Sequence, residues 1–203
     1  MGKKRASNLI LLGDPGSGKA TQATRLLRRY PFFYNLDMGR EVRKPSVKAL
    51  YDYKRPTATG KLTPTRVVRH IFRTVIRRIP GSKEILFNGT PKMIGEARLV
   101  AKLLKRYKRS NPLVIYLSIP MSETIRRVGR GRRYGQKRIK RDDDSLRALL
   151  NRARYYHTQI ARVVVFFRKR YVFKKVSGIG TRDEVFRKIV RFVEANIGKG
   201  SAR

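Results

Sequence analysis

A glycine-rich segment with one lysine follows the first apolar run of the chain. The run Asn8–Leu12 continues directly into Gly13–Thr21, whose letters are GDPGSGKAT. Glycines let backbone N–H groups turn inward around an anion, and the lysine can reach the outer phosphates of a nucleotide. The match to G-x-x-x-x-G-K-[ST] fails only at its last position, where Ala20 stands just before Thr21. The pattern predicts a phosphate-binding loop, and an ordinary glycine-rich turn is the alternative. Its candidate nucleotide-binding residues are Gly13, Gly16, Ser17, Gly18, Lys19, Ala20 and Thr21.

Further segments follow this loop in the order and at the spacing of one enzyme family. They are Thr21–Ala23 after the loop (G-T-Q-A), Met38–Arg43 (T-G-D-x-L-R), Gly60–Pro64 (G-x-L-V-P), Asn88–Lys92 (D-G-F-P-R), Arg126–Arg130 (R-x-x-G-R), and Arg141–Asp144 with Arg152 and Tyr156-His157 (R-x-D-D, R and Y-H). On these motifs the chain resembles the adenylate kinases, which are P-loop nucleoside monophosphate kinases, over nearly its whole length.

The resemblance implies transfer of a phosphoryl group between adenine nucleotides. Such transfer needs cations that hold both nucleotides in line and neutralise charge on the moving group. The resemblance places Arg43 on the AMP phosphate and Lys92 and Glu96 on the same monophosphate side. The catalytic cations that it implies are Lys19, Arg126, Arg130, Arg141 and Arg152.

Several residues depart from the family pattern. Asn88 and Arg40 stand where the family has aspartates, and Mg²⁺ usually takes one or two carboxylates, so these changes predict weakened Mg²⁺ binding. Lys92 replaces an arginine and loses its planar fork, while Glu96 replaces a glutamine expected to contact adenine. Ordinary drift within the family is the alternative explanation. We therefore expect bound ATP or ADP, weakly held Mg²⁺, and no metal site built from side chains alone.

The charge of the chain indicates a polyanionic partner. Among 203 residues, 51 are Lys or Arg and 13 are Asp or Glu, which gives a net charge of +38. With 40% apolar residues the chain can still bury a normal core, so it is not a disordered basic tail. It contains no cysteine, which excludes disulfides, thiol catalysis and cysteine-based zinc sites. The positive charges of a compact protein with this net charge repel one another and destabilise the fold unless an anion binds. We expect that anion to be RNA, in particular ribosomal RNA.

Basic residues recur on several expected elements with no acids to balance them. In one helix, arginines three or four residues apart lie on one face, which suits contact with several phosphates. The candidate RNA-binding residues are Arg66, Arg69, Arg73, Arg77, Lys105, Arg106, Lys108, Arg132, Arg133, Lys137, Arg138 and Lys140.

The elements that must position these residues alternate between strands and helices. This rhythm is typical of an α/β fold, with helices on both faces of a parallel sheet, as the P-loop monophosphate kinases have. Strands are predicted over 8–13, 32–36, 84–88, 113–119 and 171–176, and helices over 20–29, 64–79, 94–107, 123–127, 144–170 and 183–196. One domain is expected over 1–203, with its core at 8–42, 63–125 and 142–197, a monophosphate-binding insertion at about 43–62 and a short basic lid at about 126–141.

Two functions follow from these features. The first is an RNA-bound, ribosome-associated protein on an adenylate kinase-like fold, with weak or lost phosphoryl transfer. The second is an active adenylate kinase, which converts ATP and AMP into two ADP, with a highly basic surface. A membrane-surface protein is a weaker third, because no terminal helix pairs bulky apolar residues with a basic face. No apolar run is long enough for a membrane span and Met1–Ser7 is too short for a secretory signal, so a cytoplasmic, ribosome-associated location is expected.

Overall fold

The computed structural model describes residues 7–51, 63–133 and 158–197. Within them, five strands form one parallel sheet in the order β2-β3-β1-β4-β5. The strands are β1 (Leu9–Gly13), β2 (Phe33–Asp37), β3 (Glu84–Asn88), β4 (Leu113–Ser118) and β5 (Phe173–Ser177). The central β1 pairs with β3 on one side and with β4 on the other. The predicted α/β class, with the sheet of a P-loop monophosphate kinase, is confirmed.

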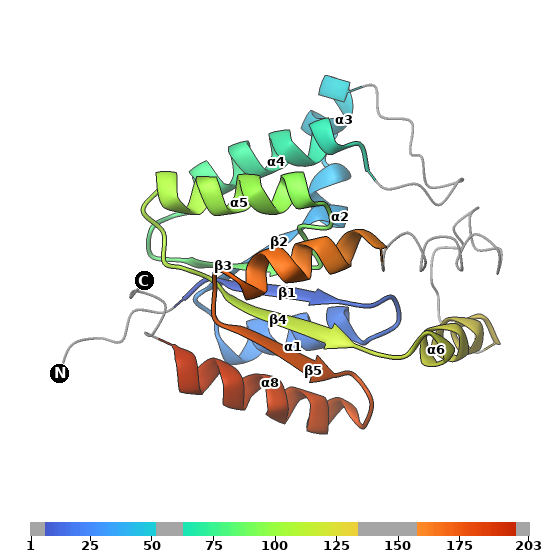
Figure 1. Cartoon of the computed structure of the whole chain (residues 1–203). Helices are drawn as coiled ribbons and strands as arrows, with labels where there is room; N and C mark the ends of the chain where they lie inside the picture. The colour runs from blue at the N-terminus through green and yellow to red at the C-terminus, as the bar shows by residue number, and fades with distance from the viewer. Residues whose placement is uncertain (1–6, 52–62, 134–157, 198–203) are drawn as a thin grey trace.

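Helices cover both faces of this sheet (Figure 1). One face carries α1 (Lys19–Arg29) and α8 (Arg182–Asn196), and the other carries α4 (Thr65–Arg78), α5 (Ile94–Arg106) and a helix over 158–168. The short helices α2 (Met38–Val42) and α3 (Pro45–Tyr51) follow β2, and α6 (Met121–Arg133) follows β4.

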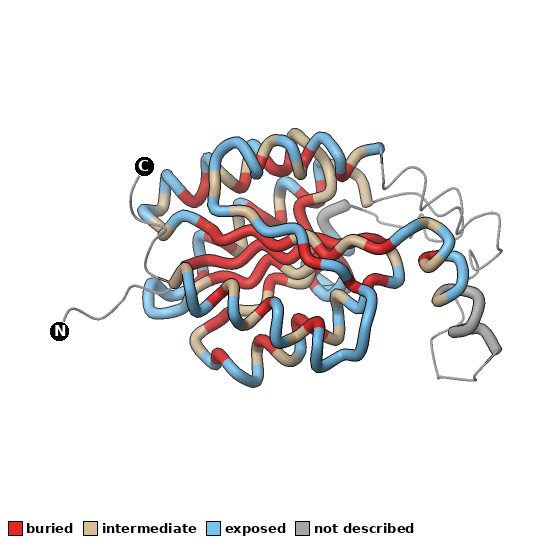
Figure 2. Tube along the Cα trace, turned by 60° about the horizontal axis from the view of Figure 1, so that its bottom comes forward, coloured by how far each residue is buried: buried red, intermediate tan, exposed pale blue. Residues whose placement is uncertain are grey.

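The alternation of side chains along β1 divides the core into two layers. Ile10 and Leu12 pack in the cluster beneath α4 and α5, whereas Leu9 and Leu11 pack in the cluster beneath α1 and α8. All four side chains are fully buried, because a central parallel strand is covered on both faces. Figure 2 shows the buried residues along the strands and the inward sides of the helices. The cations therefore collect on the outer helix faces.

The carboxyl ends of all five parallel strands meet at one edge of the sheet. Gly13, Asp37 and Asn88 end β1, β2 and β3 there, and the register pairs Asp37 with Asn88. Ligands of open parallel sheets bind at this edge, where loops and helix N-termini converge. The opposite edge holds the strand beginnings and the carboxyl ends of α4 and α5.

Most predicted element boundaries lie within two residues of those in the structure, and two of the differences have a clear cause. Helix α6 continues to Arg133, six residues beyond its predicted end, through Gly129 and Gly131. A glycine inside a helix costs only about 1 kcal/mol relative to alanine and does not end it. The last strand begins at Phe173 rather than residue 171, because the Tyr171 N–H still donates to the Phe167 carbonyl of the preceding helix.

Parts of the predicted insertion and lid lie outside the described residues. These parts are 52–62 and 134–157, so the domain boundaries remain predictions. The described end of the predicted helix over 144–170 is helical at 158–168.

Candidate active site

The glycine-rich segment forms a tight loop between β1 and α1. Gly13 permits the close approach, since a Cβ there would lie 2.7 Å from Ser17 Oγ and 2.9 Å from Leu117 Cβ. Gly16 and Gly18 have φ angles of 79° and 85°, which residues with a Cβ rarely adopt. The predicted phosphate-binding residues thus form the turn that begins at Gly13 and the first residues of α1, Lys19–Thr21.

The start of α1 is open for an anion. The N-cap residue Gly18 has no side chain that could cap the helix, and the first N–H groups of a helix have no acceptor within it. The Ser17 hydroxyl oxygen beside them is buried and has no hydrogen-bond partner among the described residues. Uncapped N–H groups at the positive end of a helix are suited to phosphate oxygens.

Lys19 lies across the mouth of this loop. Its Nζ donates to the Gly13 carbonyl at 3.2 Å, and its Cε lies 2.7 Å from where a Cβ on Gly89 would stand. Burial and the nearby charge of Lys92 lower the pKa of Lys19 to about 8, although Asp14 and Asp37 act to raise it. The ammonium is therefore mostly protonated at pH 7 and can pair with a phosphate.

Asp14 anchors the loop to the neighbouring strand. Its carboxylate is buried and accepts hydrogen bonds from the Tyr116 hydroxyl and from the Ile119 N–H, the latter at 2.9 Å. Its charge also acts on Lys19. The sequence analysis did not single out this residue, because its partners lie more than 100 positions away.

Asp37 supplies a carboxylate that the sequence analysis missed. It is half-buried at the end of β2, is paired in register with Asn88, and accepts a hydrogen bond from the Arg40 N–H at 3.2 Å. Asp37 stands three positions before the aspartate that the family pattern expects at 40. Its charge nevertheless reaches Lys19. Although Asn88 and Arg40 replace aspartates, Asp37 still supplies a carboxylate at this edge of the sheet. Nothing in the structure supports the predicted weakening of Mg²⁺ binding.

On the monophosphate side, Glu96 of α5 is held by the backbone just before its helix. Its carboxylate is buried and accepts from the N–H groups of Lys92 at 2.9 Å and Met93 at 3.2 Å. Burial raises the pKa of Glu96, while these two hydrogen bonds and the charges of Lys92 and Arg69 oppose the shift. Lys92 lies near Lys19, as its effect on that pKa requires. Arg43 is exposed just after α2.

On the lid side, one glutamate of α6 holds two arginines. Glu123 accepts hydrogen bonds from Arg126 and Arg127, which lower its pKa to about 2. Arg127 also donates to the carbonyls of Gly16 at 3.2 Å and Gly178 at 3.0 Å. Arg127, which was not among the predicted site residues, thus contacts the phosphate loop, and the catalytic role of Arg126 stays a prediction.

The side chains of the remaining predicted lid cations lie outside the described part of the chain. Arg130 lies in α6 and its side chain is outside the described part, as are the whole of Arg141 and Arg152. No group of three or more His, Asp or Glu that could hold a metal ion occurs among the described residues.

Comparison with known proteins accounts for this arrangement. The adenylate kinase family model matches residues 11–172. The chain belongs to the adenylate kinase family. Curated adenylate kinases of Porphyromonas gingivalis and Phocaeicola vulgatus are 29% and 27% identical to it over 192 and 190 residues. Each alignment covers 92% of this chain, with 95% and 98% of the two relatives. The match includes the phosphate loop, both departures at 40 and 88, and the whole of α6.

Family membership accounts for the phosphate loop but not for the basic surface. The described RNA candidates on α4 and near the end of α5 are all exposed: Arg66, Arg69, Arg73, Arg77, Lys105, Arg106 and Lys108. The side chains of Arg132 and Arg133 are outside the described part, as are Lys137, Arg138 and Lys140 entirely. No helix in the described ranges is long and apolar enough to cross a membrane. Neither the site nor the relatives indicate ribosome association.

Proposed function

We propose that this adenylate kinase family member is active and transfers the γ-phosphoryl group of ATP to AMP, giving two ADP. The single observation that carries the proposal is the open start of α1 with Lys19 lying over it. This arrangement favours phosphate binding. It does not depend on the aspartates that the family has at positions 40 and 88. It supports the second function derived from the sequence over an inactive, RNA-bound protein.

The donor side is built from the phosphate loop. Backbone N–H groups at the start of α1 bind the outer phosphates of ATP, and the Lys19 ammonium pairs with oxygens of the group in transfer. Arg127 holds Gly16 in place through its carbonyl, so the loop keeps its shape when empty. Preorganised donors of this kind stabilise charge without rearranging during the reaction.

The acceptor side is expected to bind AMP between Arg43, Lys92 and the end of β3. An oxygen of the AMP phosphate attacks the γ-phosphorus of ATP, and the bond from that phosphorus to the β,γ-bridging oxygen breaks. ADP leaves and a second ADP has formed. The lid cations Arg130, Arg141 and Arg152 are proposed, on the family motif alone, to neutralise the charge of the moving group.

Asp37 is the carboxylate best placed to act toward Mg²⁺. Asp14 already accepts hydrogen bonds from the Tyr116 hydroxyl and the Ile119 N–H, whereas Asp37, at the end of β2, accepts one from the Arg40 N–H. When bound with ATP, Mg²⁺ supplies positive charge between the donor phosphate oxygens. Asp37 would hold water molecules of its shell by accepting their protons in hydrogen bonds.

The test is ADP formation by the full chain after high-salt removal of nucleic acid. We expect a turnover of about 1–100 per second from ATP and AMP, which is the ordinary range of such enzymes. Lys19→Met should lower this rate by about 100-fold or more, because it removes the cation that meets the moving group. Lys188→Met, an exposed lysine of α8, is the matched control and should leave the rate unchanged.

The Lys19 variant also separates the protein from a contaminating kinase. A rate that is the same in the wild type and in Lys19→Met would show that the observed activity comes from elsewhere. If the protein binds ATP fully but forms no ADP, the result would favour the first function, in which phosphoryl transfer is lost.

A further inference from the structure

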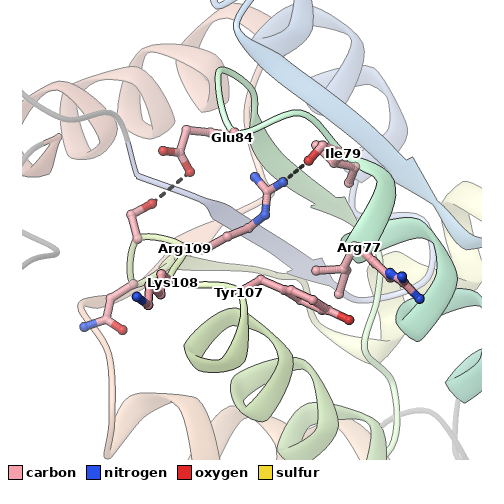
Figure 3. Close-up of a pocket in the computed structure, with 10 residues that line it drawn as sticks. Arg77, Ile79, Glu84, Tyr107, Lys108 and Arg109 are labelled. Atoms are coloured by element: carbon pink, nitrogen blue, oxygen red, sulfur yellow. Dashed lines mark hydrogen bonds between the residues drawn. The ribbon is translucent and has the colours of Figure 1, made fainter.

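A second concave surface lies at the edge of the sheet opposite the phosphate loop. A hollow of about 580 Å³ opens where α4 and α5 end, and its wall includes Arg77, Tyr107, Lys108 and Arg109 (Figure 3). A neighbouring hollow of about 750 Å³ lies between the two helices and shares Arg77 and Tyr107 with the first. The two hollows together are called the α4–α5 groove.

The charged side chains in the wall of the groove are almost all cationic. Its basic residues are Arg73, Arg77, Arg78, Lys102, Arg106, Lys108 and Arg109. The one acid is Glu84, which accepts a hydrogen bond from the Ser110 hydroxyl at 2.8 Å. Such a wall repels itself unless an anion with many charges lies in it.

Only one of these cations has a structural task. Arg109 reaches across the first hollow and donates to the Ile79 carbonyl (Figure 3). It also donates to the Lys83 carbonyl at 2.8 Å. The other six are exposed, and the ion pairs found in the described part of the chain involve none of them. These six are therefore available to a partner.

The cations form two facing rows. Arg73 and Arg77 are one turn apart on α4, and Lys102 and Arg106 are one turn apart on α5, so each pair rises by about 6 Å along its helix. The two helices run side by side on the same face of the sheet (Figure 1). A chain of phosphates lying between the rows would meet charge on both sides.

The groove also contains an aromatic ring, and the aliphatic side chains in its wall, Ile76, Ile79, Leu99 and Leu103, are buried or half-buried. Tyr107 is half-buried and forms part of both hollows, which places a ring where a base can stack. The exposed large apolar side chains in the described part are Ile125, Val165, Val172 and Ile179, and none lines the groove. A membrane surface is disfavoured, because binding there would need apolar side chains to insert.

We propose that the α4–α5 groove binds the phosphate backbone of RNA. The cations supply sequence-independent affinity, and Tyr107 stacks on an unpaired base. Because the groove lies at the opposite edge of the sheet from the phosphate loop, RNA and nucleotide can be bound at the same time. The proposal does not depend on phosphoryl transfer.

The test uses the full chain and a labelled 20-nucleotide single-stranded RNA, with binding followed by fluorescence anisotropy at 50 to 300 mM KCl. The groove variant combines Arg73→Gln, Arg77→Gln, Lys102→Gln and Arg106→Gln. The control variant removes the same charge from the exposed α1–α8 face through Arg28→Gln, Arg187→Gln, Lys188→Gln and Arg191→Gln. An unchanged circular dichroism spectrum and a cooperative thermal transition would show that the groove variant still folds.

We expect the groove variant to bind RNA at least 100-fold more weakly near 150 mM KCl. Its log–log salt slope should fall by up to about 3 units, since each phosphate contact on a single strand contributes about 0.7. The control variant should lose less than tenfold. Tyr107→Ala should weaken RNA binding without changing the salt slope.

Four results would overturn the proposal. They are no RNA binding by the wild type, equal losses in the groove and control variants, binding of DNA of the same sequence but not of RNA, and tighter binding to phosphatidylserine vesicles than to RNA. Equal losses would mean that net charge alone, and not the groove, attracts the RNA.

Discussion

At the scale of single residues, the site depends on the charges around Lys19. Asp14 and Asp37 favour its protonated form, whereas burial and Lys92 oppose it. The balance leaves the pKa of Lys19 at about 8, close enough to neutral pH for ordinary buffers to titrate it. The same ammonium must be charged to meet a polyphosphate, so nucleotide affinity and pH are coupled.

We expect the Kd for ATP to rise about tenfold between pH 7 and pH 9. Lys19 is protonated below its pKa of about 8 and loses its proton above it, while the bound phosphates favour the proton. Binding at pH 9 therefore requires proton uptake. Titration calorimetry in two buffers of different ionisation enthalpy measures both the affinity and that uptake. Lys19→Met should bind weakly with a flat pH profile, and an equal slope in both proteins would contradict this assignment.

Asp37→Asn should raise the Mg²⁺ concentration needed for half-maximal ADP formation several-fold. It should also lower the pKa of Lys19 further, because the Asp37 charge acts to raise it. The second effect is read from the pH profile of ATP binding without Mg²⁺, and so does not depend on turnover. Asp183→Asn removes an exposed carboxylate of α8 that pairs with Arg25, and is the control. If the wild type and Asp37→Asn had the same Mg²⁺ dependence and the same pH profile of ATP binding, Asp37 would have no role in the site.

At the scale of elements, the turn after β3 leaves room for the Lys19 side chain. Gly89 has a φ of 68°, and a Cβ there would lie 2.7 Å from Lys19 Cε. The turn and the loop therefore share a space that only a glycine leaves open.

Gly89→Ala is expected to cost about 1–2 kcal/mol in stability, because alanine is strained at a positive φ. It should also lower ADP formation at least about tenfold by pushing Lys19 from the loop. Urea unfolding and a coupled ADP assay measure the two effects. Gly95→Ala is the control, since nothing lies within 4 Å of its Cβ position in α5 and alanine favours a helix. A fully active Gly89→Ala protein would mean that Lys19 has room to move.

Local sequence patterns predicted most of the strands and helices, but they could not predict contacts between segments that are distant in the sequence. The strand over 84–88 and the start of α5 follow from apolar runs and periodicity. Asp37 was missed because its importance comes from the register that sets it beside Asn88, 51 positions later in the sequence. Arg127 was missed because its partners, Gly16 and Gly178, meet only when α6 folds against the loop. The mismatch at Ala20 does not prevent the loop and the start of α1 from forming, since glycines and backbone N–H groups build this part of the chain.

At the scale of the whole molecule, the net charge of +38 acts against compaction. Only five ion pairs are found within the described ranges, so most cations there are balanced by salt or by a partner rather than by the protein. Screening by salt shortens the reach of the repulsion from about 30 Å at 0.01 M to about 10 Å at 0.1 M.

The melting temperature should therefore rise with KCl between 10 and 100 mM. About 1 kcal/mol of relieved repulsion corresponds to about 2–4 °C in a chain of this size. The groove and control variants, which each remove four positive charges, should both melt higher than the wild type at low salt and converge with it at high salt. Differential scanning fluorimetry measures these shifts. A melting temperature that is independent of KCl would mean that the cations are already neutralised within the fold.

Helix α4 joins the two edges of the sheet. Its 14 residues span about 21 Å, with Arg69 acting on Glu96 beside the monophosphate side and Arg77 forming the wall of the groove. A tilt of this rod that improved the fit of AMP would reshape the groove as well. Thermodynamic reciprocity then requires RNA to change the affinity for AMP by the same factor as AMP changes the affinity for RNA. Through this one helix, the AMP concentration would change how much RNA the protein binds, and bound RNA would change how readily the protein binds AMP.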